Sequence, residues 1–254
     1  MSQLTRRLAA AFSLSLAATV AVPSYAHAMH IAEGILPLNW AALWFAVAAP
    51  FFWLGLRRMS AIGREDLSIR PLVGLMAAIV FIISCMPVPV PIAGTCSHPV
   101  GTGIPAVLLG PAISVVITAA ALLIQALLMA HGGLSTLGAD IVSMGVAGAV
   151  SAYALFKLSR RMGASLGVAG FIAGLAADWS TYTATAAELA LGLRSAGEPF
   201  MPLFTKIMIA FVPTQLPLGI LEGAITSGMV VLLYKRRPDI LVKLRVLKQS
   251  EVAA

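Results

Sequence analysis

Apolar segments alternate with short polar segments along nearly the whole chain. Most of the apolar segments approach the roughly 20 residues that a helix needs to cross a bilayer. We therefore expect helical membrane spans at 39–56, 71–86, 104–130, 139–157, 165–192 and 204–234. The fold class predicted from this pattern is all-α, an integral membrane bundle.

Basic residues gather between these segments in three clusters, which the positive-inside rule places in the cytoplasm. The clusters contain Arg57, Arg58, Arg64 and Arg70; Lys157, Arg160 and Arg161; and Lys235, Arg236, Arg237, Lys243, Arg245 and Lys248. Six spans starting from an outside N-terminus would leave the last cluster outside, whereas seven spans place all three clusters inside. We therefore predict about seven transmembrane helices.

The extra crossing is expected within 87–130, where prolines and glycines are frequent. Such residues predict short or broken helices. Irregular backbone at membrane depth is tolerated only where it is buried in protein or lines a cavity. A functional site is therefore expected in this region.

Composition supports the membrane assignment. Of the 254 residues, 59% are hydrophobic and only 11% are charged, against about 25% charged in a typical soluble domain. Mean hydropathy is +0.95. These values exclude a soluble enzyme, a disordered regulator and a fibrous protein, and the net charge of +7 fits basic cytoplasmic loops.

The first 28 residues have the three regions of a secretory signal peptide. Arg6 and Arg7 precede the apolar stretch 8–22, and 23–28 ends in Ala-His-Ala, the small-x-small pattern of a cleavage site. The alternative is an uncleaved first helix. The predicted domains are a signal peptide at 1–28, a multi-span membrane domain at 29–234 and a basic cytoplasmic tail at 235–254.

Cleavage after Ala28 would create a new amino terminus at Met29, directly before His30, outside the cytoplasm. An α-amine, the backbone nitrogen of His30 and its imidazole could then bind one ion in adjacent small chelate rings. A backbone nitrogen binds only after losing its proton, which requires an ion late in the Irving–Williams order. Ni²⁺, Co²⁺ and Cu²⁺ are the candidates, whereas zinc prefers a tetrahedral site.

His98, in the Pro/Gly-rich region, is the candidate fourth donor, and the nearby Cys96 thiolate is the alternative. His131 either orients a ligand or is simply a histidine in a turn between spans. Glu33 and Asp140 are candidates for supporting the metal residues without binding the ion. Cys85 and Cys96 could pair with each other or remain small semi-buried residues.

The sequence contains no motif for nucleotide binding or for a common type of enzyme. The chain has no GxxxxGK[ST] phosphate-binding loop and no HExxH, GxSxG, kinase or dinucleotide-binding signature. An intramembrane metalloprotease would need further side-chain ligands and a base within the spans. A self-sufficient secondary permease would favour inverted repeats, with broken helices in both halves.

Several motifs resemble the CbiM/NikM family, the substrate-binding membrane (S) components of energy-coupling-factor transporters for cobalt and nickel. The resemblance extends from Met29 to about Tyr234. It rests on Met29-His30-Ile31-Ala32-Glu33-Gly34, on Ser97-His98-Pro99, on 131–140, on 178–182 and on 217–223. The chain departs from the family pattern at Asp140, where many members carry Asn.

The resemblance implies seven transmembrane helices with a metal-binding N-terminal loop. It implies a square-planar site for Co²⁺ or Ni²⁺, made by the Met29 amine, the amide nitrogen and imidazole of His30, and the His98 imidazole. It also implies a multi-pass inner-membrane location, an extracytoplasmic mature N-terminus and a cytoplasmic C-terminus. The implied partners are a small CbiN/NikN-like membrane protein, a transmembrane coupling (T) subunit and cytoplasmic ATPases.

The chain would accordingly be a transport subunit that binds no nucleotide, not an enzyme. The ligand set suits both metals. A separate leader and a single-domain chain resemble the family members linked to cobalamin biosynthesis, which favours cobalt over the nickel alternative.

Overall fold

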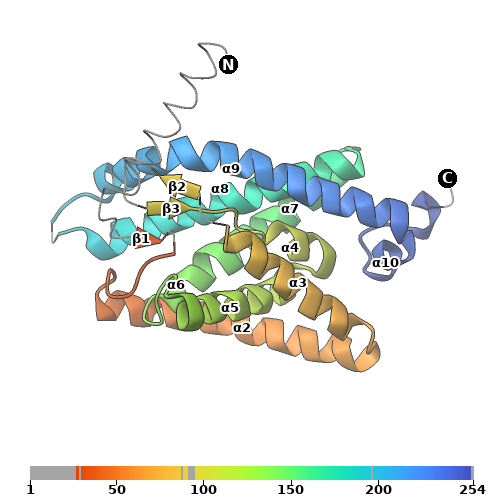
Figure 1. Cartoon of the computed structure of the whole chain (residues 1–254), viewed down its shortest axis with the longest axis horizontal. Helices are drawn as coiled ribbons and strands as arrows, with labels where there is room; N and C mark the ends of the chain where they lie inside the picture. The colour runs from red at the N-terminus through yellow and green to blue at the C-terminus, as the bar shows by residue number, and fades with distance from the viewer. Residues whose placement is uncertain (1–26, 29, 87, 91–94, 196, 253–254) are drawn as a thin grey trace, which may run out of the picture.

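The computed structural model describes residues 27–28, 30–86, 88–90, 95–195 and 197–252 as a helical bundle (Figure 1). Its helices are α2 (Leu38–Glu65), α3 (Ile69–Ser84), α4 (Gly103–Leu109), α5 (Pro111–Met129), α6 (Leu137–Asp140), the π-helix η1 (Ile141–Gly148), α7 (Ala149–Arg161), α8 (Leu166–Leu193), α9 (Phe200–Arg236), α10 (Pro238–Lys243) and the 3₁₀-helix η2 (Gln249–Glu251). The all-α class expected from the sequence is confirmed. The signal-peptide region falls almost wholly outside the described residues.

Four helical stretches within the described part are long and apolar enough to cross a membrane. They are Leu38–Glu65, Pro111–Met129, Leu137–Arg161 and Phe200–Arg236, and Ile69–Ser84 is a shorter apolar helix. The stretch Leu137–Arg161 joins α6, η1 and α7 in one continuous run. Together with α8, α3 and the short α4, these four stretches roughly agree with the predicted bundle of about seven helices, although α4 does not have the length of a crossing.

The expected segment 104–130 is broken into two helices. Gly110 has a φ of 85°, a left-handed conformation that favours glycine, and Pro111 begins α5 directly after it. At about 1.5 Å per residue, the seven-residue α4 is too short to cross a bilayer. The prediction of short or broken helices in this region is therefore confirmed.

Small residues allow α8 and α9 to pack closely. A Cβ atom on Gly174 would lie 2.5 Å from the Glu222 carbonyl oxygen, and one on Gly223 would lie 2.8 Å from the Phe171 carbonyl oxygen. Close backbone approach of this kind holds helices together in lipid. By contrast, a Cβ atom on Gly74 of α3 would meet no atom of the described residues within 4 Å, so this glycine is not needed for a close helix contact among them.

A small three-stranded sheet closes one end of the bundle. Strand β1 (His27–Ala28) pairs in parallel with β3 (Thr95–Ser97), and β2 (Val88–Val90) pairs with β3 antiparallel. Ala28 lies opposite Cys96 in this register. The strands lie at the opposite end of the bundle from α10 (Figure 1).

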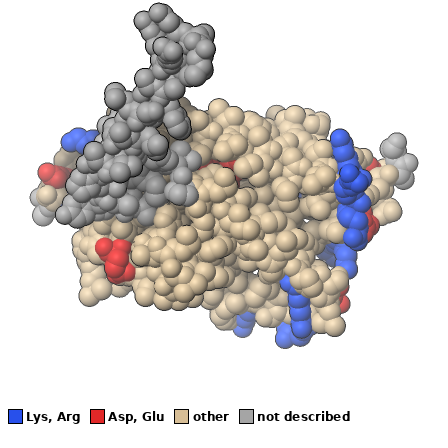
Figure 2. All heavy atoms as spheres, in the orientation of Figure 1, with Lys and Arg blue, Asp and Glu red and all other residues tan. Residues whose placement is uncertain are grey.

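Charged side chains on the visible face are concentrated toward the ends of the molecule. Figure 2 shows most of the visible Lys and Arg side chains at the end where α10 and the C-terminus lie, and mostly uncharged residues across the middle. This distribution fits a bundle that spans a bilayer with one basic end.

Candidate metal centre

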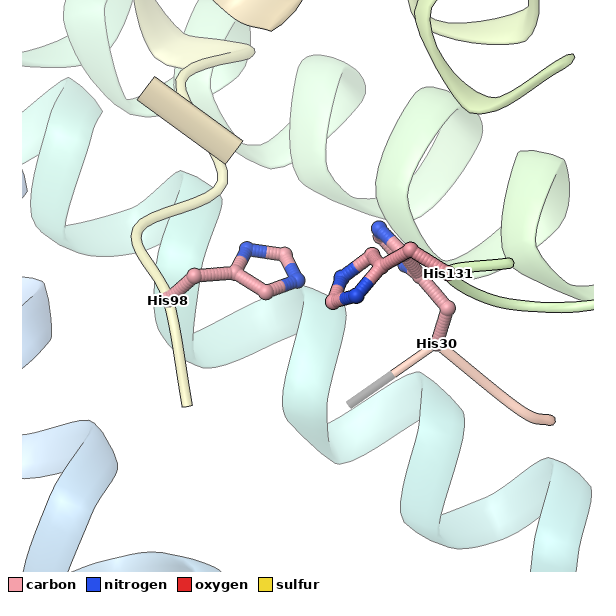
Figure 3. Close-up of side chains that lie close together, drawn as sticks. All are labelled: His30, His98 and His131. Carbon is pink, nitrogen blue, oxygen red and sulfur yellow. The ribbon is translucent and has the colours of Figure 1, made fainter. Parts of the chain in front are cut away.

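Three histidine side chains meet at the sheet end of the bundle. His30, His98 and His131 each offer a ring nitrogen, and these atoms all lie within 4.8 Å of one another. The centroid of the His30 ring lies 4.7 Å from that of the His98 ring and 4.8 Å from that of the His131 ring. Figure 3 shows the three rings converging from separate segments of the chain.

The parallel pairing of β1 with β3 brings two of these histidines together. Ala28 is opposite Cys96, and His30 and His98 each follow two residues later in their own segments. Parallel strands keep equivalent residues side by side. Segments 68 residues apart in the sequence thus arrive at the same place in the fold, with His30 and His98 only 5% and 1% exposed.

Gln125 of α5 determines which nitrogen of His30 can bind a metal. The Ser84 hydroxyl donates to the Val80 carbonyl at 2.7 Å, and its oxygen accepts the Gln125 amide N–H at 2.7 Å. The amide oxygen of Gln125 therefore faces His30 Nε2, 3.0 Å away, and accepts its hydrogen. The lone pair is left on Nδ1, the nitrogen nearer the backbone.

His98 has the opposite tautomer. Its Nδ1 lies 3.0 Å from the Pro99 carbonyl oxygen, which can only accept a hydrogen bond. Nδ1 therefore carries the hydrogen and Nε2 carries the lone pair. The two buried histidines each present one unprotonated nitrogen of the kind that binds transition metals.

Helices α8 and α9 fix the segment that carries His98. The Tyr182 hydroxyl donates to the His98 carbonyl at 3.0 Å. The Glu222 carboxylate accepts the backbone N–H groups of Val100 at 2.6 Å and Gly101 at 2.9 Å. Gln215 donates to the Ser97 hydroxyl, so three side chains from two helices hold this irregular segment.

The segment after His30 is anchored by α6 and the loop before it. Asp140 accepts the Ile31 N–H at 2.9 Å, and the Thr136 hydroxyl donates to the Ile31 carbonyl. The Glu33 carboxylate accepts the Ser135 N–H at 3.0 Å. Glu33 and Asp140, expected to support the metal residues, thus both contact the N-terminal segment or the loop that holds it.

His131 lies beside the other two histidines in a tight turn. Ala130 has a φ of 48° and Gly132 a φ of 80°, so the chain reverses sharply around His131. A Cβ atom on Gly133 would lie 2.6 Å from the Glu33 Cα. The loop therefore packs directly over the N-terminal segment. Within the described residues, His131 Nε2 has no hydrogen-bond partner.

Burial favours the neutral form of the three imidazoles. It lowers the pKa of His30 well below the ordinary value, and the neighbouring His98 and His131 lower it further. The pKa of His98 falls to about 4, chiefly through burial, and that of His131 is also lowered by burial. Neutral imidazoles are the form that binds metal ions.

Two candidate donors cannot be placed. Met29 and the side chain of Cys96 lie outside the described residues. Cys85 carries a free thiol, and its sulfur lies 3.2 Å from Gln125 Nε2.

The sequence left the supporting roles of several residues unassigned. Gln125 and Gln215 stand out only as polar residues in apolar segments, whereas Tyr182 and Glu222 lie in the family-like motifs 178–182 and 217–223, which assigned them no particular role. Glu188 of α8 is buried close enough to Asp140 for their carboxyl groups to repel each other. A polar residue inside an apolar helix was thus the available signal for Gln125, Gln215 and Glu188.

The fold and the histidine cluster together define a multi-pass membrane protein with a buried candidate site for a transition-metal ion. Residues 30–240 match the family described as CbiM, cobalt uptake substrate-specific transmembrane region, and the chain belongs to this family.

Relatives and solved structures agree with this assignment. The cobalt transport protein CbiM of Geobacter sulfurreducens is 70% identical over 87% of this chain, which spans 64% of that relative's length. The cobalt transport protein CbiM of Sorangium cellulosum is 57% identical over 89% of this chain and 100% of its own length. A crystal structure of a truncated transition metal transporter superposes with a TM-score of 0.73 at 28% identity, covering 82% of this chain and 99% of that one.

Proposed function

We propose that the chain is the substrate-binding component of an energy-coupling-factor importer that captures Co²⁺ outside the membrane and delivers it inward. The ion would bind to the α-amine of Met29, the deprotonated amide nitrogen and Nδ1 of His30, and Nε2 of His98. His131, Glu33 and Asp140 would support these groups without binding the ion.

One observation carries this proposal: His30 and His98 lie side by side and have opposite tautomers. A lone pair on Nδ1 of His30 closes a small chelate ring with the backbone nitrogen of the same residue. The Nε2 of His98 then supplies the remaining position of a plane. Planar nitrogen ligation is typical of Ni²⁺ and Cu²⁺ and is accessible to Co²⁺.

Charge balance also supports this ligand set. Two neutral imidazoles, a neutral amine and one deprotonated amide leave a divalent complex with one positive charge. A bound ion would favour ionisation of the buried Asp140, which accepts the backbone N–H of the next residue, Ile31, and lies near the buried Glu188. An ionised carboxylate beside the site would offset the cost of burying the positive charge.

Delivery would depend on proteins other than this chain. Cleavage after Ala28 would generate the amine on the extracytoplasmic side, and the basic end would face the cytoplasm. ATP hydrolysis by cytoplasmic ATPases, transmitted by a T subunit, would drive release, and a small CbiN/NikN-like protein would complete the importer.

Cobalt is favoured over nickel because the relatives quoted above are named as cobalt transport proteins. A nickel-specific uptake component is the alternative, and a self-sufficient secondary metal permease is a more distant one. Transport by purified protein in vesicles without partners would identify the permease.

The test is intact-mass analysis combined with metal quantification on purified protein. We expect one Co²⁺ per chain and an intact mass equal to that of a chain beginning at Met29. His98→Ala should lose at least tenfold in affinity, because one of four donors is gone. A leader-retaining variant, Ala26→Leu with Ala28→Leu, should bind no Co²⁺ because its amine is absent.

The matched control is Met29→Leu, which changes the side chain but keeps the amine and the chelate rings. It should bind Co²⁺ as the unmodified protein does. Equal binding by the leader-retaining variant would show that the amine is not a ligand and would overturn the proposal.

A further inference from the structure

A basic cavity lies at the end of the molecule opposite the histidines. Its volume is about 1270 Å³, and its walls are the last turns of α7, the end of α10 and the chain that follows it. The basic side chains in its lining are Lys157, Arg160, Arg161, Arg245 and Lys248, and Glu251 is the acidic one. Figure 2 shows Lys and Arg gathered at this end.

The single acidic side chain of the cavity is already occupied. One oxygen of the Glu251 carboxylate forms an ion pair with Arg160, and the other accepts the Lys248 backbone N–H at 2.8 Å. No described ion pair involves Lys157, Arg161, Arg245 or the Lys248 side chain. Four positive charges therefore face the cavity without an acidic partner among the described residues.

The wall formed by the chain end is fixed in place. Leu241 and Leu247 are 0% and 6% exposed, so the tail is anchored in the hydrophobic core. Between them, Arg245 has a φ of 58°, a left-handed conformation that is uncommon for a residue other than glycine. Such backbone strain persists only where surrounding contacts enforce it, which indicates that the cavity is formed in advance of binding.

The position of the cavity favours a lipid as its occupant. It lies where the continuous helical stretch Leu137–Arg161 ends, and basic residues at the end of an apolar span are typical of the cytoplasmic interface between bilayer and water. Its lining is also partly apolar: Leu158 is 50% exposed, and Val242 and Val246 line the same cavity. A cationic pocket with apolar edges at this depth suits a phosphate headgroup together with the start of its acyl chains.

We propose that this cavity binds the phosphate-bearing headgroup of an anionic phospholipid. Lys157, Arg161, Arg245 and Lys248 would neutralise the headgroup, and Leu158 would contact the upper acyl chain. A zwitterionic lipid carries its own positive charge, which these residues would repel, so an anionic headgroup is selected. The proposal does not depend on the metal or its transport.

The test is titration of the delipidated full chain with phosphatidylglycerol or phosphatidylcholine, followed by native mass spectrometry. The pocket variant combines Lys157→Gln, Arg161→Gln and Arg245→Gln. The control variant combines Arg57→Gln, Arg58→Gln and Arg236→Gln, exposed residues that do not line the cavity and remove the same charge. The far-UV circular dichroism spectrum and the Tm, compared with those of the unmodified protein, report correct folding of both variants.

We expect one tightly retained phosphatidylglycerol per chain and at least tenfold weaker retention of phosphatidylcholine. The pocket variant should lose at least tenfold in affinity for phosphatidylglycerol, while the control variant should change less than twofold. Equal retention of the two lipids, or equal loss in the two variants, would overturn the proposal.

Two further outcomes also contradict it. Displacement of the lipid by millimolar inorganic phosphate would identify a site for a free anion. If the pocket variant kept its lipid but failed to assemble with partner subunits, the cavity would be a protein-docking surface.

Discussion

At the residue scale, the chemistry of the candidate site depends on which nitrogen of each histidine carries a hydrogen. Gln125 is oriented by Ser84 and accepts a hydrogen from His30, whereas the Pro99 carbonyl accepts one from His98. The identities of His30 and His98 follow from the sequence pattern. Their tautomers do not, because that of His30 depends on side chains from α3 and α5, and that of His98 depends on the backbone conformation that brings its ring to the Pro99 carbonyl.

Removing the acceptor of His30 should weaken metal binding. We expect Gln125→Leu to lower Co²⁺ affinity about 10- to 100-fold, because residues that orient a metal-binding histidine contribute at this level. Isothermal titration calorimetry measures the change. Ser84→Ala keeps the amide oxygen and removes only the group that orients it, so its effect should be smaller. Unchanged affinity in Gln125→Leu would show that Gln125 does not set the tautomer.

The lowered histidine pKa values predict the number of protons released when the ion binds. At pH 6 the amine and the amide should together release about two protons, since a free α-amine has a pKa near 8. His98, with its pKa at about 4, and His30, with its pKa lower than usual, are already neutral at this pH and release almost none. If His30 and His98 instead had the ordinary pKa of about 6.5, the two together would carry, and release on binding, roughly 1.5 further protons at pH 6.

Measurement in a weakly buffered solution at pH 6 distinguishes the two cases. Release near two protons per Co²⁺ agrees with neutral, buried imidazoles. Release near 3.5 would mean that the histidines are protonated in the metal-free protein.

At the scale of elements, the site is built where two irregular segments cross regular helices. The helices were predictable because apolar segments of spanning length are a strong signal. The parallel pairing of β1 with β3 was not, because two- and three-residue strands are too short to show an alternating pattern.

The π-helix η1 lies within what the sequence predicts as one regular span. Gly148 at its end lies against other helices, because a Cβ atom there would lie 2.6 Å from Thr181 Oγ1 and 3.0 Å from Thr102 Oγ1. These contacts come from residues distant in the sequence. No local pattern could therefore indicate the wider turn.

Glu222 should act on metal binding through the His98 segment. Glu222→Leu leaves the backbone N–H groups of Val100 and Gly101 without an acceptor. Each buried, unpaired N–H group costs about 1–3 kcal/mol of stability. We expect a 10- to 100-fold loss of Ni²⁺ or Co²⁺ affinity. Glu222→Gln keeps one acceptor, so it should restore part of the affinity and leave the absorption band of bound Ni²⁺ unchanged.

The exposed Glu198→Gln serves as the charge-matched control and should bind normally. If Glu222→Leu lowered the Tm but left metal affinity intact, Glu222 would be important for folding alone.

At the scale of the whole molecule, the two ends differ in chemistry. Three clustered histidines lie at one end, and the basic residues around α7 and α10 lie at the other. The clustering of Lys and Arg was evident in the sequence. The cavity among them was not, because it forms only when the tail folds back and buries Leu241 and Leu247.

The proposed orientation predicts which loops are accessible outside intact cells. In a background with Cys85→Ser and Cys96→Ser, we expect Ser195→Cys, between α8 and α9, to react with a membrane-impermeant maleimide. Ser250→Cys, in the tail, should react only after permeabilisation. The reverse pattern would place the basic end outside, contrary to the positive-inside rule.

The register between Ala28 and Cys96 has a consequence for the timing of maturation. The two metal-binding segments are already aligned while residues 27–28 are still attached to the chain. Cleavage after Ala28, as proposed, would then remove a strand without having to move His30. The precursor would be folded but unable to hold the ion, and the missing donor would appear only after the N-terminus had left the cytoplasm. Proteolysis would thus confine capture to the compartment where uptake begins.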